Sequence, residues 1–73
     1  MTVEQLLDDL VGLSDAEIAR RLEQTYPDWV VWRYPPGPWW AMRQANHRRP
    51  PATVRAYTVA RLIRRIDQRE ENA

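Results

Sequence analysis

The chain of 73 residues contains no cysteine and no phenylalanine, and it has only two glycines. Without cysteine it can form neither a disulfide nor a thiolate metal site. It also lacks any apolar run near the roughly 20 residues that a membrane-spanning helix needs. We recognise no cleavable signal segment and therefore expect a soluble, cytoplasmic protein with no membrane partner.

The residues that usually perform catalysis are scarce. His47 is the only histidine and lies in a stretch rich in arginine and proline, and Ser14, the only serine, is better explained as a helix cap. No carboxylate lies near the aromatic residues to form an acid–base pair. The two glycines provide no phosphate-binding loop. We therefore expect a protein that is not an enzyme, with no catalytic residue, metal site, cofactor or small-molecule substrate.

What the chain does have is a dense aromatic cluster. All four tryptophans lie within twelve residues, on either side of the turn 35–38: Trp29, Trp32, Trp39 and Trp40. A chain this short forms one small domain, here 1–73, and buries only roughly 60% of the surface that its unfolded chain exposes. Because phenylalanine is absent, some of the tryptophans must fill the core, and the others are free to present a binding face.

The net charge of +1 hides a strong asymmetry along the chain. Residues 1–28 carry seven acids against two arginines, a net charge of −5, whereas residues 29–73 carry nine arginines against three acids, a net charge of +6. One interpretation is that the two halves attract each other, within the fold or across a dimer. The other is that the basic half binds an anionic partner.

Capping signals predict two N-terminal helices, at about 3–11 and 15–25. Each is preceded by a hydroxyl residue with Gln or Glu three positions later, the pattern of a capping box (Thr2 with Gln5, Ser14 with Glu17). A C-terminal helix is predicted at about 59–70, with an apolar stripe on one face and Thr58 as its N-cap.

Between the helices, two β-rich runs around the proline-glycine turn predict an antiparallel hairpin over about 29–44. The segment 53–57 alternates like a third strand but also fits the start of a helix. The predicted fold class is α+β: N-terminal helices, a β-hairpin extended to three strands if 53–57 pairs, and a C-terminal helix packed on one face of the sheet.

Side-chain alternation then divides the hairpin into two faces. A four-residue loop at 35–38 pairs Tyr34 with Trp39, although a shift of one residue would exchange parts of the two faces. We assign one face to the core: Trp29, Val31, Arg33, Trp40, Met42 and Gln44. We expect the other face to be open to water: Val30, Trp32, Tyr34, Trp39, Ala41 and Arg43.

The open face predicts a non-catalytic protein-binding or regulatory module that forms a homodimer or binds another protein. Trp32, Tyr34 and Trp39 would be its anchors, since exposed aromatic patches mark interaction sites. Arg33 and Arg43 would pair with acids of the partner, for example the N-terminal helices of a second copy. The alternatives are that the tryptophans only pack on one another across the strands, or that the basic half binds nucleic acid.

Two fragments resemble a DNA-binding family. Residues 13–22 are similar to the first helix of the helix-turn-helix in response-regulator-type transcription factors, and residues 51–57 to the start of their recognition helix. In that family a few residues separate the two helices, whereas here the hairpin stands between them. The resemblance implies phosphate or base contacts by Arg55, Arg61 and Arg65. The basic connector adds Arg48 and Arg49 as candidate nucleic-acid contacts.

A second resemblance covers more of the chain. Residues 26–33 (YPDWVVWR) and 37–43 (GPWWAMR) resemble a pattern in small proteins of high-GC bacteria that carry a helix, a tryptophan-rich hairpin and a closing helix. The resemblance spans roughly residues 14–70. It implies the order of the elements and no particular activity.

Overall fold

A computed structural model of the chain describes residues 2–71 and shows an α+β fold. In chain order its elements are α1 (Val3–Leu10), α2 (Asp15–Thr25), β1 (Trp29–Arg33), β2 (Trp39–Arg43), β3 (Ala52–Ala56) and α3 (Val59–Glu71). The predicted fold class is thus confirmed, and the segment that fitted either a strand or a helix is the strand β3. Within residues 2–71, no helix is both long and apolar enough to cross a membrane.

The helices begin where the capping signals place them. Thr2 accepts a hydrogen bond from the backbone N–H of Gln5 at 3.2 Å, and the Gln5 side chain accepts one from the N–H of Thr2, which completes the predicted capping box. The Ser14 hydroxyl likewise accepts from the N–H of Glu17 at 3.2 Å. Such caps satisfy N–H groups that have no partner within the helix. Thr58 caps α3 in the same way.

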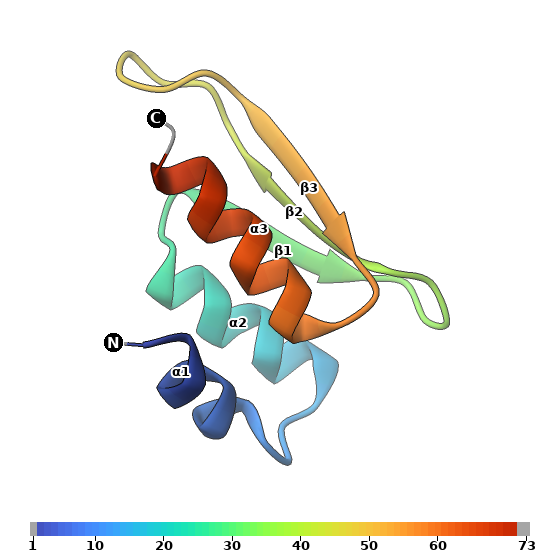
Figure 1. The fold of residues 1–73 in the computed structure, drawn as a ribbon. Coiled ribbons are helices and arrows are strands. Elements are labelled where there is room, and N and C mark those ends of the chain that lie inside the picture. Colours follow the sequence, from blue (N-terminus) through green and yellow to red (C-terminus); the bar gives the residue numbers. More distant parts are fainter. Residues whose placement is uncertain (1, 72–73) are drawn as a thin grey trace.

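The sheet is antiparallel, with strand order β1-β2-β3, and all three helices lie on one side of it (Figure 1). Helix α2 packs against β1, α3 packs against β3 and β2, and α1 packs against α3. The core between the two layers is completely closed to solvent at its centre, where the largest residues are Leu22, Trp29, Leu62, Ile63 and Ile66. The other side of the sheet is covered by no helix of residues 2–71.

The predicted hairpin register is wrong by one residue. The structure pairs Arg33 with Trp39 and Trp32 with Trp40. The reason lies in the turn, where the carbonyl of Tyr34 accepts a hydrogen bond from the N–H of Gly37 at 2.8 Å. Tyr34 therefore belongs to the turn and does not pair with Trp39 in the sheet. Because side chains alternate along a strand, a shift of one residue moves every side chain of β2 to the opposite face.

The shift places each side chain of β2 on the face opposite to the predicted one, whereas the side chains of β1 lie on the predicted faces. Trp39, Ala41 and Arg43 point toward the helices and are 3%, 0% and 2% exposed. Trp40 and Met42, which were assigned to the core, lie on the opposite face and are half-buried.

Candidate functional site

The face of the sheet that lies away from the helices is the candidate site, and we call it the open face. Alternation along the three strands places six side chains on it: Val30, Trp32, Trp40, Met42, Thr53 and Arg55. Four of the six are apolar, and Val30 is 46% exposed. Arg55 is the single charged residue of the set. Apolar groups gathered on an exposed face in this way are typical of interaction surfaces.

An aromatic stack crosses the middle of the open face. The rings of Trp32 and Trp40, directly opposite each other on β1 and β2, lie parallel within 6° with centroids 6.3 Å apart. The guanidinium of Arg55 on β3 lies 5.7 Å from the centre of the Trp40 ring. Such stacking contributes about 0.5–1.5 kcal/mol beyond area burial, and it holds the three side chains in one fixed row across the sheet.

Two exposed tyrosines flank the same end of the sheet. Tyr34 follows β1 and is 76% exposed, and Tyr57 follows β3 and is 73% exposed. The register aligns Arg33, Trp39 and Ala56 across the three strands, so both tyrosines leave the sheet at this end. This end of the sheet therefore carries two exposed aromatic side chains, in addition to the half-buried stack on the open face.

The structure brings together only part of the predicted interface. Tyr34 is exposed as expected and Trp32 is half-buried on the open face, but Trp39 and Arg43 lie in the core and cannot be surface anchors. Arg33 is also on the helix side, where it forms an ion pair with Asp15 at 3.1 Å and lies 5.8 Å from the centre of the Trp39 ring. Among residues 2–71 this is the one ion pair that joins the acidic and basic halves.

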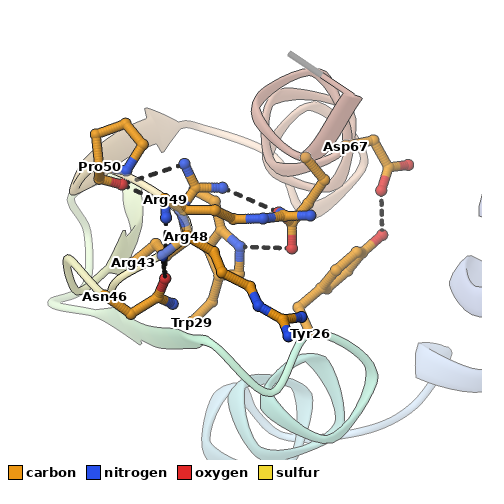
Figure 2. Close-up of polar contacts among 9 residues, drawn as sticks. Tyr26, Trp29, Arg43, Asn46, Arg48, Arg49, Pro50 and Asp67 are labelled. Carbon is orange, nitrogen blue, oxygen red and sulfur yellow. Dashed lines mark hydrogen bonds and ion pairs between the residues drawn. The ribbon is translucent and has the colours of Figure 1, made fainter. Parts of the chain in front are cut away.

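Arg43 has a structural role instead. Its side chain is 3% exposed, and its guanidinium lies 2.9 Å from a carboxylate oxygen of Glu70 and also donates to the carbonyl of Pro50. It lies over the ring of Trp29, whose indole Nε1 donates to Glu70 at 3.2 Å. Figure 2 shows these groups converging on the end of α3. A buried charge is tolerated only where such partners replace water.

Arg49, a predicted nucleic-acid contact, belongs to the same cluster. Its guanidinium bonds to Glu70, and the Asn46 side chain accepts hydrogen bonds from the backbone N–H groups of Arg48 and Arg49 (Figure 2). The Asn46 contacts shape the connector between β2 and β3, and the Arg49 contact ties it to the last turn of α3. Arg48 itself is exposed.

A further polar contact joins α2 to α3. Tyr26 donates its hydroxyl hydrogen to Asp67 at 2.6 Å (Figure 2). Burial, with the hydrogen bond and the negative charge of Asp67, raises the pKa of the Tyr26 hydroxyl well above its ordinary value. Tyr26 is therefore neutral at physiological pH and serves as a hydrogen-bond donor.

The basic residues of α3 form a second surface. Arg61 and Arg65, predicted contacts, are exposed there together with Arg64 and Arg69. In the part of the chain that the structure describes, none of the four forms an ion pair. Arg55, the other predicted contact, lies on the adjacent strand.

Sequence reasoning missed Trp40 and Met42 as members of the open face, because the register was offset. It also missed Glu23, whose carboxylate accepts a hydrogen bond from the backbone N–H of Val31 at 2.9 Å. No sequence pattern marks such a contact between a helix side chain and a strand backbone. Among residues 2–71, no group of three His, Asp or Glu side chains is arranged to hold a metal ion.

The fold defines a small α+β domain in which helices cover one face of a three-stranded antiparallel sheet. Comparison with protein-family models, with curated proteins and with solved structures finds no significant match to this chain.

Proposed function

We propose that the protein is a non-catalytic binding module that associates with a second copy of itself through the open face. The observation that carries the proposal is the stacked pair Trp32–Trp40, which stands with Val30 and Met42 on a face that no helix of residues 2–71 covers. A small domain gains much from a second layer over such a face, because burial of apolar surface contributes roughly 25 cal/mol per Å².

The distribution of charge on the open face suits contact with a second copy of the chain. The open face has no acid, and its one charge, Arg55, is held against Trp40 and so leaves Val30, Trp32 and Met42 as an uncharged centre. A two-fold dimer places the same patch on both subunits and brings two such apolar centres together. Two sheets then pack face to face about 10 Å apart, as in a β-sandwich.

The test uses two valines that differ in position. Val30 lies on the open face and is 46% exposed, while Val11 follows α1 and is 78% exposed. Sedimentation velocity over a concentration series should show dimerisation of the wild type. Val30→Glu should weaken dimerisation at least about tenfold, because burying an unpaired carboxylate in the apolar interface should cost more than about 1.4 kcal/mol. Val11→Glu, with the same change of charge, should leave it unchanged.

Two results would contradict the proposal. One is a wild type that stays monomeric at every concentration, and the other is a dimer that both variants weaken equally. Circular dichroism of each variant checks that the fold is retained. Tryptophan fluorescence gives an independent measure, because Trp32 and Trp40 lose contact with water only when the open face is covered.

Nucleic-acid binding is the second candidate, and one observation favours it. The exposed arginines of α3 lack ion-pair partners among the described residues, and two of them, Arg65 and Arg69, line the same hollow as Arg55 and Trp40. Arginines beside an aromatic ring are suited to phosphates and stacked bases. Fluorescence anisotropy with labelled single-stranded and duplex DNA should then show binding that weakens steeply as salt rises. If neither DNA binds at low salt, this second function is excluded.

A further inference from the structure

The two edges of the sheet differ in their free hydrogen-bonding groups. On β1 the backbone N–H of Val31 donates to Glu23 at 2.9 Å, and that of Trp29 donates to the carbonyl of Tyr26 at 3.0 Å. Helix α2 also packs along this strand. Natural sheets protect an edge with such contacts, because unpaired strand groups can bind another strand.

At β3 the opposite edge remains open. Opposed residues in an antiparallel pair alternate between those that exchange hydrogen bonds and those that do not. Since Val31 donates to Glu23, its partner Ala41 turns its backbone groups toward Val54 of β3. The neighbours of Val54, Thr53 and Arg55, therefore direct their N–H and C=O groups outward, and no backbone group outside the sheet within residues 2–71 bonds to them.

The surroundings of this edge are basic. A shallow hollow lies along β3 beside α3, and besides Val54 it is lined by Trp40, Thr53, Arg55, Arg65, Gln68 and Arg69. No acid lines it, and its three arginines form no ion pairs among the described residues. A second copy paired along β3 would bring three arginines from each chain together, and like charges so placed repel.

We propose that the β3 edge binds an extended acidic segment of a partner protein, which adds a fourth strand to the sheet. The backbone of the added strand would pair with Thr53 and Arg55, which offer two N–H and two C=O groups. Its side chains would alternate between the two faces. Acids directed to the helix side would meet Arg65 and Arg69, and those on the other side would meet Arg55.

The proposal goes beyond self-association, because it uses a sheet edge rather than the open face. The β3 edge favours a peptide over a nucleic acid, because its outward N–H and C=O groups at strand spacing match another peptide backbone. Arginines alone would suit either class. The acidic character of the partner follows from charge complementarity with the hollow.

The probe is a fluorescein-labelled peptide of alternating glutamate and valine, with two control peptides. One has lysine in place of glutamate, and the other keeps the sequence but carries N-methyl groups on alternate backbone nitrogens. Fluorescence anisotropy should show binding of the acidic peptide only. The N-methylated peptide should bind at least about tenfold more weakly, since it cannot complete the hydrogen-bond ladder.

Variants of the protein locate the site. The double variant Arg65→Gln with Arg69→Gln should bind the acidic peptide at least about tenfold more weakly. The matched variant Arg20→Gln with Arg21→Gln removes the same charge from α2 and should bind normally. Amide hydrogen exchange measured with the peptide should slow at Thr53 and Arg55 and stay unchanged at Val31.

Three results would overturn the proposal: no binding of the acidic peptide at low salt, equal binding of the N-methylated peptide, or equal loss in the two double variants. Tighter binding of a single-stranded oligonucleotide with the same dependence on Arg65 and Arg69 would also overturn it, in favour of a nucleic-acid site. Val30→Glu separates the two proposals, because it weakens the open-face dimer and leaves peptide binding at β3 intact.

Discussion

The guanidinium of Arg43 lies 2.9 Å from the carboxylate of Glu70, and the Arg43 side chain is only 3% exposed. The contact joins the end of β2 to the last turn of α3, and Trp29 and Arg49 bond to the same carboxylate. Glu70 thus holds the sheet, the connector and the C-terminal helix together. Its position near the C-terminal end of α3 opposes the helix dipole, which indicates that the contacts to Arg43, Trp29 and Arg49 outweigh that cost.

Glu70→Ala should therefore destabilise the fold strongly. It leaves the buried Arg43 charge without its anionic partner, a change that typically costs about 3–5 kcal/mol. Glu71→Ala, one residue later on an exposed position, should change the free energy of unfolding by less than about 0.5 kcal/mol. Urea denaturation followed by circular dichroism measures both. Equal effects of the two variants would show that the Arg43–Glu70 contact contributes nothing.

The hairpin register predicts opposite consequences for two adjacent tryptophans. Trp39→Ala removes a side chain that is 3% exposed and should cost about 3–5 kcal/mol. Trp40→Ala removes a half-buried side chain of the open face and should cost at most about 2 kcal/mol, from the loss of its stacking contacts. The same denaturation measurement compares them. The reverse order of effects would support the register that pairs Tyr34 with Trp39.

Alkaline pH should weaken the link between Tyr26 and Asp67. Because the pKa of Tyr26 is raised in the folded state, the unfolded chain loses this proton first as pH increases. The contribution of Tyr26 is thus fully present below about pH 10, the ordinary value for tyrosine, and is lost progressively above it.

Tyr26→Phe tests this contribution. At neutral pH it removes the 2.6 Å hydrogen bond to Asp67 and should cost about 1–2 kcal/mol. Above about pH 10 the difference between wild type and variant should shrink. Tyr57→Phe, at an exposed position, is the control and should behave as the wild type throughout. A difference from wild type that stays constant up to the alkaline limit of folding would contradict the prediction.

Glu23 should protect the β1 edge. Glu23→Ala removes the acceptor for the N–H of Val31 and should cost about 1–2 kcal/mol. Hydrogen exchange of the Val31 amide should become faster, whereas amides of β3 should be unaffected. Gln24→Ala, on an exposed position of the same helix, should alter neither. Unchanged exchange at Val31 in Glu23→Ala would show that α2 alone shields this edge.

The helices were predictable because their signals are local. Thr2 and Ser14 cap the N–H groups of residues three positions later, so the interaction that starts each helix is visible within four residues of sequence. The apolar stripe of α3 is equally local, and its residues Leu62, Ile63 and Ile66 form the buried face as periodicity indicates.

The register was not predictable in this way. Trp39 and Trp40 are adjacent and identical, and both strands carry large apolar side chains on each face, so alternation alone selects neither register. The choice depends on the turn hydrogen bond between Gly37 and Tyr34 and on the fit of Trp39 under the helices. Arg43 was placed on the open face by the same offset register, although arginines are in any case rarely buried. Its burial depends on Glu70, which lies 27 residues away in sequence.

The contact between Glu23 and Val31 also sets how many strands the domain can accept. Two N–H groups of the β1 edge are bonded to Glu23 and Tyr26 and α2 packs along this strand, whereas the β3 edge has no such contacts among the described residues, so an added strand would pair at β3. A strand bound at β3 would extend the sheet at that edge, while Glu23 and α2 disfavour pairing beyond β1. A domain of this kind terminates a series of paired strands instead of extending it, and so can bind a strand without promoting the repeated stacking that builds a fibril.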